Sequence, residues 1–195
     1  PGLLARHSAH AGAAGAALML AGATLPGAQP VLANYIPTID HAVFQLGQLL
    51  FGAGVLAAAL DRRLLPERGA DPPEGPIPSA AQDGLRAAAV GLGLAGLTLA
   101  VSALRQTEGL ALEVRTELLV WGAGHVLQLV STLAMVAIWL LLLERSLGRA
   151  PVSRGAAAEL FAALLVPWLI APALAATGTS SSAYRAGFTD LMRFA

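Results

Sequence analysis

Long apolar stretches free of Asp, Glu, Lys and Arg alternate with short charged segments along the chain. One of them, Leu118–Leu143, runs for 26 residues. A membrane core about 30 Å thick is crossed by about 20 helical residues, so stretches of this length are typical of transmembrane helices. The pattern predicts five membrane-spanning helices, at about residues 9–28, 41–60, 84–104, 118–143 and 160–176.

The predicted fold is all-α, a polytopic transmembrane helix bundle that forms one domain over residues 1–195 and contains no β-sheet. Lipid tolerates only helices or closed barrels, and the apolar stretches lack the two-residue alternation of barrel strands. Residues 61–83, rich in proline and charge, are predicted to form a solvated loop. Pro167 and Pro172 predict a kink in the last helix.

The two ends of the sequence add two expectations. The first apolar stretch is rich in Ala and Gly rather than Leu. Such a helix is stable chiefly inside a bundle, where small residues let neighbouring backbones approach. The chain begins at Pro1 rather than at Met, so we expect it to be a segment of a longer polypeptide.

The composition excludes several classes of protein. Hydrophobic residues make up 56% of the chain and charged residues only 12%, whereas ordinary soluble domains carry about 25% charged residues. The chain has no cysteine, so within it there are no disulfides and no thiolate metal ligands. Its formal net charge of zero and the lack of a basic stripe exclude nucleic acid as a partner.

Arginine supplies every basic residue, and the arginines divide unevenly between the two sides of the predicted membrane. Eight lie at the N-terminal end, in the connection after the second helix and in the connection after the fourth; four lie on the opposite side. Because cytoplasmic segments carry the excess of basic residues, the N-terminal end and the 61–83 loop are predicted to be cytoplasmic. We expect a multi-pass protein of the inner (plasma) membrane, with His125 in the outer half of the bilayer.

Two of the predicted helices carry polar residues along one face. In the fourth helix these are Trp121, His125, Gln128 and Thr132, and in the second they are His41, Gln45, Gln48 and the small Gly52. We expect both faces to point into the bundle or toward another subunit, away from lipid. His125, Trp121 and Gln128 are candidate cofactor-binding residues, because neutral imidazole is a common heme and copper ligand. A structural hydrogen bond between helices is the alternative role for His125.

The stretch ELLVWGAGHVLQLVSTLAMVAIWLLLLE, residues 117–144, resembles the sixth helix of subunit I in the heme-copper oxidase superfamily. That helix carries a copper-binding His with a Gly just before it and a Trp four residues earlier, and Trp121, Gly124 and His125 match this pattern. Residues 34–55 and 184–195 are similar to a divergent branch of bacterial subunit I-like proteins. The resemblance implies that the chain corresponds to helices three to seven of a larger subunit I-like bundle.

The sequence also departs from the family pattern. Active oxidases carry a Tyr four residues after the copper-binding His, and here that position is Leu129. The family's seventh helix supplies two more copper-binding histidines, and residues 160–176 contain none. By resemblance His125 is a metal ligand of an incomplete site, so we expect no copper. The family's heme ligands lie on the second and tenth helices, outside this chain, which leaves room for heme in the full-length protein.

These features favour an integral membrane subunit of a respiratory or other electron-transfer complex, surrounded by lipid and by other membrane subunits of that complex. No complete catalytic site is present, so the sequence assigns no catalytic residue, and whether the full-length protein is an oxidoreductase stays open. A non-catalytic membrane scaffold or anchor is the alternative. A small carrier or channel for polar solutes is the third hypothesis, although the sequence shows no internal repeat.

Overall fold

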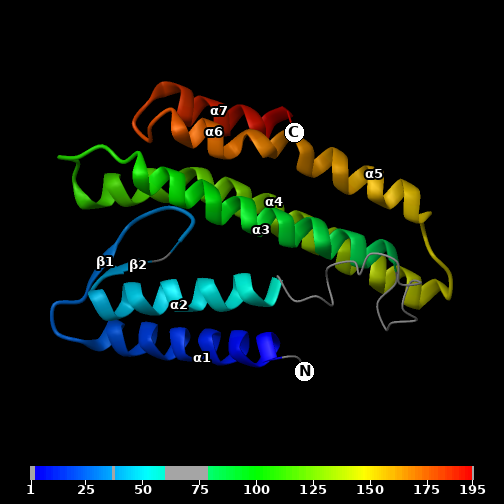
Figure 1. Cartoon of the computed structure of the whole chain (residues 1–195), viewed down its shortest axis with the longest axis horizontal. Helices are drawn as coiled ribbons and strands as arrows, with labels where there is room; N and C mark the ends of the chain where they lie inside the picture. The colour runs from blue at the N-terminus through cyan, green and yellow to red at the C-terminus, as the bar shows by residue number, and fades with distance from the viewer. Residues whose placement is uncertain (1–2, 37, 60–78, 195) are drawn as a thin grey trace.

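The computed structural model describes residues 3–36, 38–59 and 79–194, which are predominantly helical (Figure 1). Helices α1 (Leu3–Thr24) and α2 (Ala42–Ala59) form one hairpin, and helices α3 (Ser79–Leu104) and α4 (Leu112–Leu147) form another. The chain continues through α5 (Arg154–Leu165), the 3-10 helix η1 (Val166–Ile170), α6 (Ala171–Ala176) and α7 (Ser182–Phe194). The predicted all-α bundle is confirmed.

Four helical segments of the described chain are long and apolar enough to cross a bilayer. They are α2, most of α3, α4, and the continuous path from Arg154 to Ala176 through α5, η1 and α6. The first predicted span forms α1, but its Ala- and Gly-rich sequence leaves it outside this group. The chain is therefore a helical, multi-pass membrane protein.

The connection between α1 and α2 contains a short antiparallel sheet, so the prediction of no sheet was wrong. Strand β1 (Gln29–Val31) pairs with β2 (Thr38–Asp40), with Pro30 opposite Ile39. The prediction treated each apolar run as a helix and its connections as unpaired loops. A non-helical segment at the end of a helical hairpin still has to bond its backbone N–H and C=O groups, and here the two strands bond each other.

The helices do not all end where the uncharged runs end. Helix α4 is 36 residues long and continues past charged residues on both sides of 118–143 before Gly148 ends it with a φ of 66°. A left-handed residue of this kind closes a helix most easily when it is Gly. Of the predicted 61–83 loop, residues 61–78 lie outside the described residues and 79–83 begin α3. The last span changes to 3-10 geometry at Pro167, where a kink was predicted.

Glycine lets α1 and α2 approach each other backbone to backbone. A Cβ atom built on Gly15 would lie 2.5 Å from the Phe51 nitrogen, and one on Gly47 would lie 2.7 Å from the Gly15 oxygen. Gly22 and Gly54, each seven residues further along its helix, make contacts of the same kind. The small residues of the first apolar stretch therefore do what was predicted for them, since only they permit this spacing.

The main core lies between α3 and α4 and extends to the helices that follow. Along α4 its buried members repeat at helical spacing and form one face: Val126, Leu129, Leu133, Ala137 and Leu140. Phe161 of α5 is 2% exposed, and its ring occupies the place that a side chain at Gly84 of α3 would take. Helix α7 packs against both α4 and α6, which brings the end of the chain back to the beginning of α4 (Figure 1).

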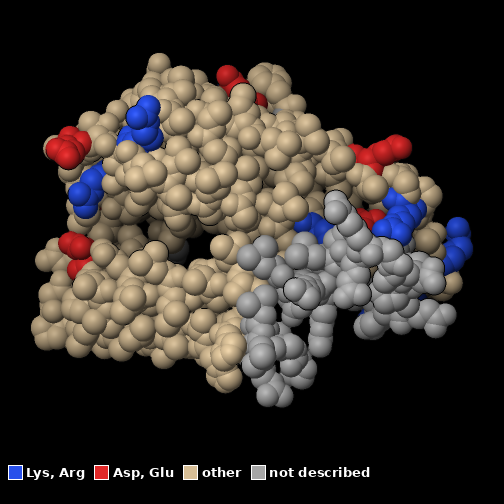
Figure 2. Space-filling model, in the orientation of Figure 1, with Lys and Arg blue, Asp and Glu red and all other residues tan. Residues whose placement is uncertain are grey.

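Charged side chains are distributed as a membrane protein requires. On the face drawn in Figure 2 they gather mainly toward the two ends of the molecule, with a long uncharged surface between them. The same view shows a hollow between the α1–α2 hairpin and the helices above it. Charge at the ends places the costly groups where water and headgroups lie.

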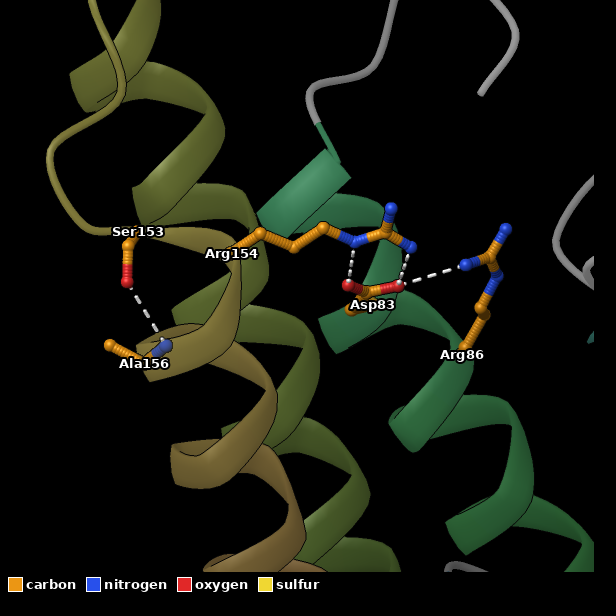
Figure 3. A network of polar contacts seen from close by, with 5 residues as sticks. All are labelled: Asp83, Arg86, Ser153, Arg154 and Ala156. Carbon is orange, nitrogen blue, oxygen red and sulfur yellow. Dashed lines mark hydrogen bonds and ion pairs between the residues drawn. The ribbon is translucent and has the colours of Figure 1, made fainter. Parts of the chain in front are cut away.

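An ionic contact joins the beginnings of α3 and α5 at one of these ends (Figure 3). Asp83 accepts from Arg86 at 2.8 Å, one turn later on α3, and from the Arg154 Nε at 2.9 Å. Ser153 caps α5 by accepting from the Ala156 nitrogen. Because the Arg154 side chain is 54% exposed, the ion pair contributes no more than about 1 kcal/mol, and it mainly fixes where α5 starts.

The glycine contact predicts opposite effects for the same substitution at two positions of α2. Gly47→Ala puts a methyl group against the α1 backbone and should lower the free energy of unfolding by about 1–3 kcal/mol. Gly52→Ala is the matched control, because nothing lies within 4 Å of a Cβ there; helix propensity should then raise stability by up to about 1 kcal/mol. Thermal unfolding of the detergent-solubilised protein measures both. A Gly47→Ala variant as stable as the wild type would contradict the close approach.

Candidate functional site

His125 lies buried in α4, and both of its ring nitrogens are bonded within the chain. The Nδ1 atom is 2.7 Å from the Trp121 carbonyl oxygen, and Nε2 is 3.2 Å from the Tyr35 hydroxyl. A carbonyl oxygen only accepts, so Nδ1 carries the proton and Nε2 accepts from the Tyr35 hydroxyl. The lone pair that a metal ion would need is therefore engaged by Tyr35.

Aromatic rings from three parts of the chain surround the imidazole. Its centroid lies 4.9 Å from the Trp121 ring, 5.0 Å from Tyr35 and 5.9 Å from Phe188. Tyr35 and Trp121 meet edge to face at 5.9 Å, and so do Phe188 and Tyr184 at 5.2 Å, which is a favourable geometry for aromatic pairs. We call Tyr35, Trp121, His125, Tyr184 and Phe188 the His125 cluster.

Two glycines of α4 make room for the cluster. A Cβ built on Gly124 would lie 2.7 Å from the Tyr35 Cβ and closer still to the ring. A Cβ on Gly122, on another side of the helix, would lie 2.7 Å from Phe188 and 3.0 Å from the Tyr184 hydroxyl. Tyr35 and α7 therefore reach α4 within a single turn, on different sides of the helix, because the WGAGH sequence omits two side chains.

The segment that carries Tyr35 is held in a strained backbone conformation. Tyr35 has a φ of 72°, in the left-handed region that a residue with a side chain seldom adopts, at a cost on the order of 1–3 kcal/mol. Its contacts with Trp121, Gly124 and His125 offset this cost. Next to it, the Asn34 amide donates to Glu117 of α4 at 3.0 Å. Strain of this kind collects at functional sites, which marks residues 32–36, the 32–36 segment below, as part of the candidate site.

The Tyr184 hydroxyl joins three helices at a single oxygen. It donates to the Leu118 carbonyl at 2.9 Å and accepts from the Gly122 nitrogen at 2.9 Å, and Ser102 of α3 lies 3.2 Å away. A phenol has one proton and two lone pairs. Because the Tyr184 hydroxyl donates its proton to the Leu118 carbonyl, it accepts a hydrogen bond from the Ser102 hydroxyl. Every bonding position of the hydroxyl is filled, and the Tyr184 side chain is completely buried.

The polar residues of the two predicted faces differ in where their side chains lie. On α4, His125 and most of the Trp121 side chain turn into the cluster, whereas Gln128 and Thr132 are exposed. The Thr132 hydroxyl donates to the Gln128 carbonyl one turn earlier. Within α2 and its approach, the polar groups bond locally: His41 accepts from the Val43 nitrogen, Gln45 donates to Asp40, and Gln48 accepts from Thr38. The structure thus gathers His125 and Trp121 into one site and leaves Gln128 outside it.

The described part of the chain offers no ready-made metal centre around His125. It contains no group of three or more His, Asp or Glu side chains that could hold a metal ion. An open pocket of about 490 Å³ lies beside Tyr35, lined by the β1–β2 hairpin and Phe44. Its walls carry no charged residue, and its two polar side chains, Tyr35 and Thr38, already bond His125 and Gln48.

One polar atom of the cluster remains without a partner. The indole nitrogen of Trp121 is buried, and among the described residues nothing accepts a hydrogen bond from it. An indole N–H donates only, and leaving a buried donor unpaired costs about 1–3 kcal/mol. This donor lies in the ring that contacts both His125 and Tyr35. The cluster therefore offers one hydrogen bond to a group from outside the described chain.

Sequence reasoning found His125, Trp121 and Gly124 but missed Tyr35, Tyr184 and Phe188. Helical spacing relates residues of one helix, but it does not predict contacts between residues that lie 60 to 90 positions apart in the sequence. One usable signal was present: these 195 residues hold only two tyrosines, and both lie in the cluster. No protein-family model, curated protein or solved structure matches the chain. The fold and the site define it as a multi-pass helical membrane protein with an aromatic cluster around a buried histidine.

Both tyrosines are predicted to ionise above the ordinary value of about 10. Burial raises the pKa of Tyr184, against smaller opposing effects of Ser102 and Gly122, and burial with the nearby Glu117 raises the pKa of Tyr35. The folded state then retains protons that the unfolded state releases, so stability should fall as pH rises from about 10 through the raised pKa values. The difference in tyrosinate absorbance between the wild type and each Tyr→Phe variant isolates one group. Ionisation below pH 10 with the helices intact would contradict the burial of the cluster.

Gly124→Ala should detach the 32–36 segment, because the added methyl group takes the space of the Tyr35 ring. We expect the pKa of Tyr35 to return toward its ordinary value while that of Tyr184 stays raised. Gly93→Ala on α3 is the matched control, since nothing lies within 4 Å of a Cβ there. Tyrosinate titration of both variants tests this, and a Gly124→Ala protein that titrates like the control would show that the contact is not formed.

Proposed function

We propose that this chain is an integral membrane subunit of an electron-transfer complex of the inner membrane, and that it contributes contacts to a cofactor rather than a copper centre. Its multi-pass helical structure supports a membrane subunit. The link to electron transfer rests on the similarity of residues 117–144 to the sixth helix of heme-copper oxidase subunit I. The observation that supports the proposed cofactor contact is the buried indole N–H of Trp121, which has no hydrogen-bond partner among the described residues.

The bonding of His125 supports a structural role for the position that matches the family's copper ligand. Its Nε2 accepts a hydrogen bond from the Tyr35 hydroxyl, and its Nδ1–H donates one to the Trp121 carbonyl. A metal ion there would have to displace Tyr35 and find further ligands, and one imidazole does not hold copper by itself. We propose that His125 fixes the orientation of Trp121 and Tyr35.

Heme, when bound by the full-length protein, supplies one-electron redox chemistry. Of the residues in the cluster, Trp121 fits such a group best. An indole N–H matches a carboxylate such as a heme propionate, and a hydrogen bond to a charged acceptor contributes about 1.5–3 kcal/mol. The chain's own residues then orient this donor: the Tyr35 ring meets the indole edge to face, and the His125 ring lies beside it.

A non-catalytic scaffold without a cofactor is the second candidate. The observation that favours it is the complete bonding of His125 within the chain, because a residue kept only for packing needs no open coordination position. In that case the cluster holds the helices together at this end of the bundle. The Trp121 indole N–H then donates a hydrogen bond to a group of a neighbouring subunit.

The two candidates predict different spectra for the complex purified through the full-length protein. The electron-transfer subunit should show stoichiometric heme. Trp121→Phe keeps the ring but removes the donor, and it should weaken heme retention about tenfold or more. Trp139→Phe is the matched control, because Trp139 lies on the same helix and is 57% exposed. Absence of heme from the wild-type complex would favour the scaffold, and equal heme in the two variants would remove Trp121 from the proposal.

Copper analysis of the same complex tests the incomplete site. We expect no stoichiometric copper, and we expect His125→Ala to lower stability by about 1–3 kcal/mol through the loss of two hydrogen bonds and a buried ring. His41→Ala serves as the control, since His41 bonds the start of its own helix. Stoichiometric copper that disappears in His125→Ala and persists in His41→Ala would refute the structural role.

A further inference from the structure

The Tyr184 hydroxyl bonds two backbone groups that a regular α-helix also bonds to each other. In such a helix the Gly122 N–H donates to the carbonyl of Leu118, four residues earlier. Here the Gly122 nitrogen donates to the hydroxyl, and the hydroxyl donates to the Leu118 oxygen, each at 2.9 Å. A hydroxyl that bonds both groups ties α7 to this turn of α4 and restrains the shape of the turn.

The turn bridged by Tyr184 carries the residues that receive the 32–36 segment. Trp121 lies inside it and meets the Tyr35 ring, while Glu117, one residue before it, accepts from Asn34. The next turn holds His125, whose Nε2 accepts from Tyr35. A change of shape between 118 and 122 would therefore move Glu117 and Trp121 relative to His125, and the strained 32–36 segment contacts both sides of that joint.

We propose that Tyr184 is a positioning residue, whose hydroxyl holds the 118–122 turn of α4 in the shape that lets the 32–36 segment dock on His125. Helix α7 thereby influences a segment about 150 residues earlier in the chain through α4. The proposal does not depend on heme or on the electron-transfer assignment. It concerns only whether α7 and the 32–36 segment are coupled.

The coupling has a structural basis at both ends of the path. On the α7 side, Ser181 caps the helix by accepting from the Tyr184 nitrogen, and Phe188 packs on Gly122 and His125. On the other side, the left-handed Tyr35 depends on its contacts with α4 to offset its strain. A small loss at α4 is therefore enough to release the segment.

Labelling of a single engineered cysteine tests the coupling in the full-length protein in its membrane. These 195 residues hold no cysteine, so Ala33→Cys adds one new thiol at a half-buried position of the 32–36 segment, and peptide mass spectrometry identifies it. Tyr184→Phe in this background removes only the hydroxyl. We expect maleimide to label the engineered thiol about fivefold faster or more, the shift that follows from losing a buried hydrogen bond.

Two controls separate positioning from general loss of stability. Ser102→Ala removes the third bond of the Tyr184 hydroxyl but keeps its bridge between Leu118 and Gly122, so the labelling rate should stay near that of the parent. Phe161→Leu lowers the stability of the core far from the cluster and should also leave the rate unchanged. An unchanged rate in Tyr184→Phe, or an equal rise in Phe161→Leu, overturns the proposal.

If the Tyr184→Phe protein does not accumulate in the membrane, a second variant tests the same coupling. Ser181→Ala removes the cap of α7 at the surface, which loosens the first turn that carries Tyr184 and leaves every side chain of the cluster in place. The labelling rate of the engineered thiol should rise in the same direction by a smaller factor. A rate equal to that of the parent would then overturn the coupling.

Discussion

Close approach at glycine is the constraint on which the rest of this structure depends. Between α1 and α2, Gly15 and Gly47 bring two backbones together with no side chain between them. At the beginning of α4, Gly122 and Gly124 admit the rings of Phe188 and Tyr35 to the helix surface. Lipid offers no hydrogen bonds, so the polar groups of a membrane bundle must reach one another, and missing side chains shorten the distance they have to cover.

The helices could be predicted because the membrane imposes a length and a polarity on each of them. Uncharged runs predicted where α2, α3 and α4 lie, and two prolines predicted the change of geometry at η1. The sequence pattern did not predict the β1–β2 hairpin, because its six residues have no periodicity long enough to stand out from a loop. It also did not predict the extension of α4 past Arg115 and Glu144, since charge ends the apolar run and not the helix.

The candidate site was predictable only along a single helix. Spacing placed Trp121 and His125 on one face of α4, and both belong to the cluster. The same spacing included Gln128, which lies on that face but beyond the reach of the 32–36 segment and is exposed. Tyr35 and Tyr184 come from distant parts of the chain, and the left-handed backbone at Tyr35 has no local cause such as Gly or Asn. Such contacts arise from tertiary packing, which a single sequence does not encode in any short pattern.

The contrast between His125 and Gln128 bears on what kind of membrane protein this is. His125 is satisfied inside the chain, by Tyr35 and the Trp121 carbonyl. Gln128, one turn further along α4 and near the middle of the uncharged 118–143 run, presents its amide at the surface. An amide in hydrocarbon costs several kcal/mol unless it is bonded. A neighbouring helix that bonds this amide would remove the cost, which is in keeping with the proposal that the chain acts as one part of a larger membrane assembly.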